Sequence, residues 1–338
     1  MRIGHIVPLL AKRYTNAAVR RRAVFLKGKS GIGKSQTVHQ VSDLLAAHIP
    51  EWKGVIDLRL SQMEPTDLRG IPANIDGKTA WLAPEFLPAA NSSGIIFFDE
   101  ITSAPPSIQA AAYQYILDRK MGEHKIPDGW MIVAAGNLTS DRGVTFQMAA
   151  PLLNRMCEVE VTTVLDDWIS HAVVAGVRPE VTSFLKDRPD LLHKFDGKGQ
   201  IEPFPSPRSW FAVSDSMGLD LRPEDRIEVF RGDVGHEAAT TFEGHLRFWE
   251  TLPRIDDILQ GRTITLPDEL SALYSVAMGI ASRVDATTFD NAWKVLSRLP
   301  KDLQTMTVKL AYKRDRGLVA SPAFTLWATE NQSAFKRA

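Results

Sequence analysis

The chain has 338 residues, of which 44% are hydrophobic and 24% are charged, a balance typical of a globular protein with a sizeable core. Its 40 basic and 40 acidic side chains give a formal net charge of zero, which argues against binding nucleic acid or membranes through overall charge. The single cysteine, Cys157, excludes an intramolecular disulfide framework and a multi-cysteine metal cluster. No run approaches the roughly 18 apolar residues of a membrane span, and no leader pattern is present. We therefore expect a cytoplasmic protein.

The first part of the chain alternates between strand-like and helix-like segments, which predicts a mostly parallel sheet with helices on its faces. Between the second and third strands, residues 63–93 form a long proline- and glycine-bearing stretch with little periodicity, which indicates a functional loop. Residues 120–127 read as a hairpin just before the fourth strand. The five strands are expected at 23–27, 54–60, 94–98, 130–135 and 157–161.

Beyond about residue 163 the pattern is helical, because apolar residues recur at intervals of three and four. We expect an α/β domain over residues 1–163, a helical domain over 164–255 and a helical C-terminal extension over 256–338. The helical segments are expected at 166–175, 180–195, 207–217, 223–229, 237–250, 267–283 and 288–311.

A loop between the first strand and the following helix has the spacing glycine, four residues, then Gly-Lys-Ser. Its glycines let the backbone curl so that N–H groups point at phosphate oxygens, and the helix N-terminus adds partial positive charge. Lys34 can reach the β- and γ-phosphates, and Ser35 can supply a hydroxyl to Mg²⁺. We expect ATP to bind along Gly28, Lys29, Ser30, Gly31, Ile32, Gly33, Lys34, Ser35 and Gln36.

Two adjacent carboxylates, Asp99 and Glu100, end the buried run 94–98. Because parallel strands open on the same edge of a sheet, Asp99 is expected beside Ser35 at the metal, and Glu100 can polarise a water for attack on the γ-phosphorus. In the alternative interpretation the two acids have no catalytic role, and they only end the strand and begin the next helix. With the acids beside the phosphate loop, the pattern predicts hydrolysis.

Three further polar residues are candidates for the same chemistry. Asn137 follows the fourth strand and can hydrogen-bond the attacking water or the γ-phosphate. The guanidinium groups of Arg155 and Arg208 can stabilise charge that gathers on the transferred phosphoryl group. Taken without their context, both arginines fit better as surface ion-pair partners.

The order of these motifs resembles the AAA+ ATPase superfamily, and within it the MoxR branch that includes the CbbQ-type activases. The resemblance covers roughly residues 20–215 and implies a P-loop NTPase fold in which an all-α lid follows the five-stranded sheet. It identifies residues 28–35 with Walker A, Asp99 and Glu100 with Walker B, and Asn137 with sensor 1. The features that indicate this branch are Asp99-Glu100-Ile101, residues 104–109, 134–137, 152–156 and 206–208.

The same resemblance implies a homo-oligomer, a ring hexamer in which Arg155 enters the neighbouring subunit's site and Arg208 is sensor 2 on the lid. Residues 139–143 lack the Asn-Pro common in this branch, and Arg142 is a second candidate for the arginine that acts across the interface. Residues 63–93 would be the insert in helix 2. The family role would be remodelling or activating a protein client, often with a partner that bears a von Willebrand factor A domain.

Two other functions remain open at this point. One is a nucleic-acid-associated motor of the same superfamily, such as the motor half of a restriction or packaging system, although the zero net charge disfavours it. The other is a non-hydrolysing switch or a small-molecule kinase, which would not need paired carboxylates, an asparagine sensor and two arginines. A zinc site at His236-Glu237 is not expected, because position 240 is threonine and the second imidazole is absent.

Overall fold

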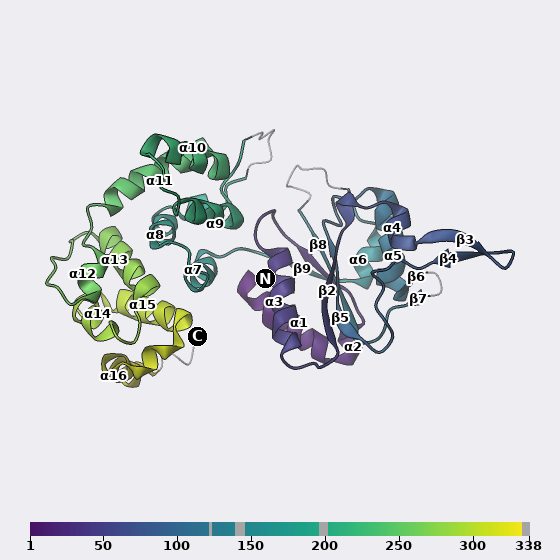
Figure 1. Ribbon diagram of the computed structural model, residues 1–338, viewed down its shortest axis with the longest axis horizontal. Coiled ribbons are helices and arrows are strands. Elements are labelled where there is room, and N and C mark those ends of the chain that lie inside the picture. The colour runs from purple at the N-terminus through teal and green to yellow at the C-terminus, as the bar shows by residue number, and fades with distance from the viewer. Residues whose placement is uncertain (122–123, 139–145, 196–201, 333–338) are drawn as a thin grey trace. The chain divides into compact units, whose positions relative to one another are not determined.

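The computed structural model describes residues 1–121, 124–138, 146–195 and 202–332, which divide into two compact units (Figure 1). The first unit holds the described residues up to Val164, and the second holds those from Leu165 onward. Each unit has its own buried apolar clusters. Within the described residues, no helix is long and apolar enough to cross a membrane.

The first unit is built on a sheet of five parallel strands in the order β2-β5-β8-β1-β9. All five predicted strands are confirmed, with ends that differ by one or two residues. Two interior strands, β5 and β8, are covered on both faces, which explains why their sequences are nearly continuous apolar runs. The strands are β1 (Val24–Lys27), β2 (Trp52–Arg59), β5 (Ser93–Asp99), β8 (Trp130–Gly136) and β9 (Cys157–Glu160).

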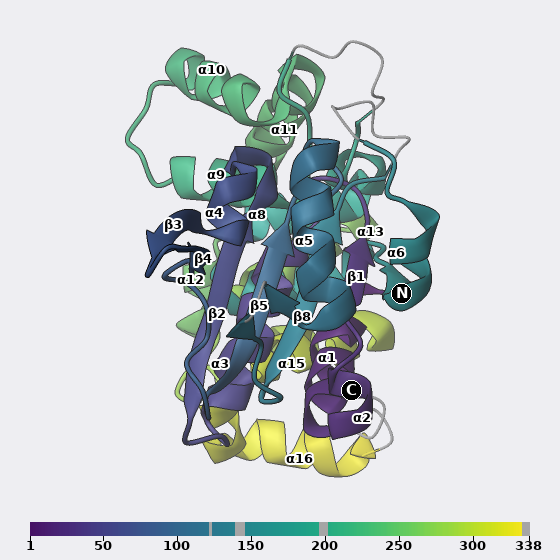
Figure 2. The ribbon, with the colours of Figure 1, turned by 90° about the vertical axis from the view of Figure 1, so that its right-hand side faces the viewer.

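Helices cover both faces of this sheet (Figure 2). Alternate residues of β5 enter the two cores: Ile95 and Phe97 pack with α1 and α3, whereas Ile96 and Phe98 pack with α4 and α5. This period of two follows from the pleat of a strand. The predicted α/β fold is therefore confirmed. The helices are η1 (Ile3–His5), α1 (Ile6–Thr15), α2 (Ala17–Arg20), α3 (Lys34–Ala46), η2 (Leu60–Gln62), α4 (Pro65–Arg69), α5 (Pro106–Asp118) and α6 (Ala150–Arg155).

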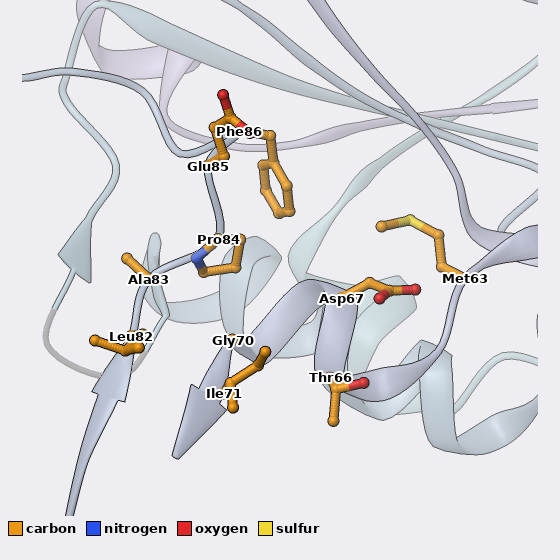
Figure 3. Close-up of a pocket in the computed structure, with 10 residues that line it drawn as sticks. All are labelled: Met63, Thr66, Asp67, Gly70, Ile71, Leu82, Ala83, Pro84, Glu85 and Phe86. Carbon is orange, nitrogen blue, oxygen red and sulfur yellow. The ribbon is translucent and has the colours of Figure 1, made fainter. Parts of the chain in front are cut away.

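The insert over residues 63–93 has more regular structure than its sequence pattern indicates (Figure 3). It contains α4 and an antiparallel hairpin of β3 (Ile71–Ile75) and β4 (Lys78–Leu82). Asp76 and Gly77 join the strands with φ of 52° and 75°, the left-handed conformation of a two-residue hairpin turn. The hairpin predicted at 120–127 is confirmed in its described residues, since β6 (Lys120–Met121) pairs with β7 (His124–Lys125).

All the regular elements in the described part of the second unit are helices. The helix predicted at 223–229 continues to Val234, and two other predicted helices were also wrong in extent. The segment 180–195 stops being α-helical at Asp187, and the segment 288–311 is two helices. In each case a proline intervenes, Pro189 or Pro300, and a proline has no N–H to continue the helical hydrogen bonds. The elements are α7 (Leu165–Val174), α8 (Pro179–Asp187), η3 (Pro189–Leu192), α9 (Pro207–Ser216), α10 (Pro223–Val234), α11 (His236–Trp249), α12 (Ile255–Leu259), α13 (Leu270–Arg283), α14 (Phe289–Leu296), α15 (Lys301–Arg314), η4 (Arg316–Ala320) and α16 (Pro322–Glu330).

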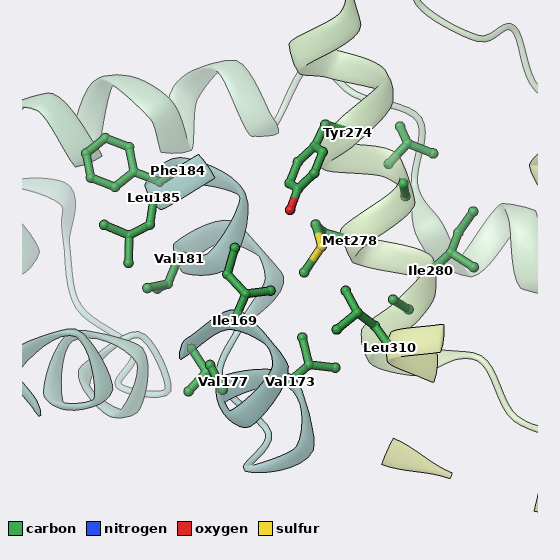
Figure 4. Close-up of a cluster of buried hydrophobic side chains, with 14 of the residues drawn as sticks. Ile169, Val173, Val177, Val181, Phe184, Leu185, Tyr274, Met278, Ile280 and Leu310 are labelled. Carbon is green, nitrogen blue, oxygen red and sulfur yellow. The ribbon is translucent and has the colours of Figure 1, made fainter. Parts of the chain in front are cut away.

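A single hydrophobic cluster runs through this unit and joins helices on both sides of residue 255 (Figure 4). Ile169 and Phe184, from α7 and α8, belong to the same cluster as Met278 of α13 and Leu310 of α15. The division into a lid over 164–255 and an extension over 256–338 stays a prediction, and the two segments share a core.

His245 of α11 is surrounded by aromatic rings, with centroid distances of 5.5 Å to Phe184, 6.4 Å to Phe242, 6.0 Å to Phe248 and 6.3 Å to Trp249. Its Nε2 atom is buried and has no hydrogen-bond partner among the described residues. Burial lowers the pKa of this imidazole to about 4, so the folded protein holds it neutral.

We predict that this imidazole makes the second unit sensitive to acid. The unfolded chain binds a proton at His245 near pH 6.5 and the folded chain near pH 4, so its contribution to stability is complete above pH 6.5 and declines as the pH falls towards 4. In thermal melts, the decrease in Tm between pH 7.5 and pH 5 should be a few degrees smaller for His245→Phe than for the wild type. Equal decreases would contradict the prediction.

Candidate functional site

The phosphate loop joins the end of β1 to the start of α3. Gly31 and Gly33 have φ of 73° and 95°, a region where other residues are strained. At Gly28, a Cβ atom would lie 2.7 Å from the carbonyl oxygen of Val161 and 2.8 Å from Cδ1 of Ile32. The spacing of the glycines in the sequence therefore has a direct steric cause.

The ammonium group of Lys34 is buried inside this loop. It donates hydrogen bonds to the carbonyl oxygens of Gly28 at 2.7 Å and Lys29 at 2.8 Å, and to Oδ1 of Asn137 at 3.1 Å. Asn137 follows β8, the neighbour of β1 in the sheet. The structure thus brings together the lysine and the asparagine that the sequence analysis proposed for one site.

Ser35 and Asp99 meet at the same sheet edge, as expected. The Ser35 hydroxyl donates to Oδ2 of Asp99 at 2.6 Å, and Asp99 itself is buried. Oδ1 of Asp99 accepts from the backbone N–H of Glu100 at 2.8 Å. A hydroxyl and a carboxylate oxygen are the ligand types that Mg²⁺ takes at phosphate sites, so this pair fits that ion.

Glu100 follows directly, in the left-handed region with φ of 57°. Its carboxylate accepts a hydrogen bond from the hydroxyl of Ser61, which lies just beyond the end of β2. Sequence reasoning missed Ser61. Ser61 could have been recognised as a polar residue at the carboxyl end of the strand that pairs with β5. That recognition requires the strand order, which the sequence does not give.

Thr102 is a second residue that the sequence analysis missed. Its hydroxyl accepts from the backbone N–H of Asn137 at 2.9 Å, and a Cβ at Gly136 would lie 2.6 Å from its methyl group. Thr102 therefore fixes the backbone where β8 ends and aims the asparagine towards Lys34.

The two candidate arginines belong to different units of the structure. Arg155 ends α6 in the first unit, where it is exposed, and no described residue pairs with its guanidinium group. Arg208 lies in α9 of the second unit, so its role stays a prediction. Arg142 falls outside the described residues. Gln36, proposed to contact nucleotide, is exposed in the first turn of α3.

Comparison with known families identifies the region that contains this site. Residues 23–156, somewhat less than half of the chain, match the AAA domain of the dynein-related subfamily. The chain carries an AAA+ ATPase domain. Its reaction is ATP hydrolysis, and the loop, the acidic strand end and the asparagine described above all lie within the matched residues. No curated protein matches the sequence.

Several solved structures are distantly similar to the chain. NtrX from Brucella abortus in complex with ADP is 12% identical with a TM-score of 0.38, covering 97% of this chain and 67% of that one. RuvB from Thermotoga maritima is 16% identical with a TM-score of 0.39, covering 86% and 95%. PCH-2 from C. elegans is 11% identical with a TM-score of 0.35, covering 74% and 68%. These scores add nothing to what the AAA domain match shows.

We predict that Lys34→Ala weakens ATP binding by about tenfold or more, because the charged donor inside the loop is lost. Titration calorimetry with ATP measures the change. Lys53→Ala is the matched control, since Lys53 is an exposed lysine of β2 and lies outside the phosphate loop. Unchanged affinity in Lys34→Ala would show that the nucleotide binds elsewhere.

Proposed function

We propose that the protein is a MoxR- or CbbQ-like AAA+ ATPase that forms a ring and uses ATP hydrolysis to remodel or activate a protein partner. The observation that carries the hydrolytic part is the contact between Ser35 and Asp99, with Glu100 beside them on the same sheet edge. The resemblance in motif order supports the assignment to this branch, the assembly into a ring and the action on a protein partner.

In this proposal, backbone N–H groups from Gly28 to Gln36 hold the phosphates of ATP. Ser35 and Asp99 would hold Mg²⁺, which would supply charge neutralisation at the β- and γ-phosphates when bound. Lys34 would exchange its carbonyl contacts for phosphate oxygens. Glu100 would accept a proton from the water that attacks the γ-phosphorus, and Asn137 would orient that water.

The exposed position of Arg155 supports a role across a subunit interface. In a hexameric ring, its guanidinium group would stabilise charge on the γ-phosphoryl group bound by the neighbouring subunit, with Arg142 as the other candidate. Arg208 would act as sensor 2 and couple the helical unit to the nucleotide.

The client is proposed to be a protein, with a partner that bears a von Willebrand factor A domain. The neutral net charge supports a protein client over nucleic acid. A cytoplasmic location belongs to the same proposal and rests on the single cysteine of the sequence.

We predict that Glu100→Gln separates binding from hydrolysis. The amide keeps the size of the side chain and can still contact Ser61, but it cannot accept the proton of the attacking water. The kcat for ATP should fall about 100-fold or more while the Kd changes little. Release of free phosphate and titration with ATP give the two quantities, and a parallel loss of both would contradict this role.

A mixing experiment tests the trans role of Arg155. Lys34→Ala subunits keep Arg155 but bind ATP poorly, whereas Arg155→Ala subunits bind ATP but lack the arginine. Each variant alone should have little activity, and mixtures should recover part of it, because some sites combine a competent loop with a competent neighbour. Full activity of Arg155→Ala, or mixed oligomers no more active than the separate variants, would contradict the proposal.

A further inference from the structure

The β3–β4 hairpin exposes large apolar side chains at an unusual density. Ile71, Ile75, Trp81 and Leu82 are 64%, 46%, 48% and 52% exposed. Single exposed apolar residues are normal, but these four lie within 12 consecutive residues, and such clusters mark interaction sites. In the register of the hairpin, Ile71 stands opposite Leu82, so these two side chains share one face.

A pocket of about 630 Å³ opens at the base of this hairpin (Figure 3). Ile71 and Leu82 are part of its lining, so the apolar face of the hairpin continues into the pocket. The other apolar side chains that line it are those of Met63, Ala83, Pro84 and Phe86. A pocket of this size holds several apolar side chains of a ligand.

The backbone of the hairpin is also available to a partner. β3 and β4 pair only with each other, and no other strand in the described part of the chain pairs with either. Pro72 has no N–H, so the outer edge of β3 lacks one of its donors. The outer edge of β4 contains no proline, and an extended peptide can add to such an edge.

Charge at the pocket favours a cationic ligand. Asp67 and Glu85 line it with exposed carboxylates, Glu64 lies beside Asp67, and no lysine or arginine is among the lining residues. Lys78 stands opposite Ile75, at the end of the hairpin away from the pocket. An anionic membrane surface or a nucleic acid would be repelled by these carboxylates, whereas a lysine or arginine side chain would be attracted.

We propose that the hairpin and its pocket bind an extended segment of the protein partner in which bulky apolar residues alternate with lysine or arginine. The segment pairs with the outer edge of β4, places apolar side chains against Ile71 and Leu82, and sets a basic side chain near Asp67 and Glu85. This inference rests on the proposed function, because it names the part of the client that the ATPase engages.

The test uses three fluorescein-labelled peptides of equal length and the full chain without nucleotide. One peptide alternates leucine with lysine, one leucine with glutamate, and one serine with lysine. Fluorescence anisotropy should show that the leucine–lysine peptide binds about tenfold or more tighter than the other two. Equal binding of the three peptides, or binding of none, would overturn the inference.

Variants locate the binding site. The double change Ile71→Ser with Leu82→Ser should weaken binding of the leucine–lysine peptide about tenfold, and Glu85→Lys should weaken it severalfold. Leu326→Ser is the matched control, since Leu326 is an equally exposed apolar residue, at 62%, on α16 of the second unit. Unchanged binding by both hairpin variants would overturn the inference, as would a change in oligomer size caused by the double variant in place of a loss of peptide binding.

Hydrolysis is measured separately on the same samples. Because these hairpin residues lie outside the phosphate loop and the acidic strand end, the double variant should keep the basal ATPase rate, which also shows that it is folded. An active ATPase that ignores the leucine–lysine peptide contradicts this inference alone. A chain that binds the peptide but does not release phosphate contradicts the proposed function alone.

Discussion

The candidate site depends on one contact, the hydrogen bond from the Ser35 hydroxyl to the Asp99 carboxylate. The two residues are 64 positions apart in the chain and come from the start of α3 and the end of β5. They meet because β1, β8 and β5 are neighbouring parallel strands, whose carboxyl ends lie on one edge of the sheet. A buried carboxylate needs such a partner, and the hydroxyl supplies it until a cation takes that place.

A second layer of contacts holds this arrangement. Thr102 fixes the backbone of Asn137, and Ser61 holds the carboxylate of Glu100. Thr102 follows β5 and Ser61 follows β2, so residues beyond two neighbouring strands support the arrangement around Ser35 and Asp99. The left-handed backbone of Glu100 fits with these contacts, because a strained conformation persists only where the surrounding structure holds it in place.

The sequence predicted what depends on local patterns. Continuous apolar runs marked β5 and β8, and the glycine spacing marked the phosphate loop with Lys34 and Ser35 in it. The sequence analysis missed features that depend on one or two residues, or on a residue that is far away in the chain. The Asp76-Gly77 turn was not recognised, Pro300 was not used to end a helix, and Ser61 becomes meaningful only when β2 is known to pair with β5. The roles proposed for Arg155 and Arg208 involve a neighbouring subunit or the second unit, which no local pattern describes.

The most direct measurement is a crystal structure of the chain with Mg²⁺ and a nonhydrolysable ATP analogue. The account predicts that the β- and γ-phosphates lie in the loop from Gly28 to Ser35, with Mg²⁺ at the Ser35 hydroxyl and Asp99 within reach of it. Glu100 should face the γ-phosphorus across one water molecule. A triphosphate bound elsewhere, with Lys34 still on the carbonyl oxygens of Gly28 and Lys29, would contradict the central claim.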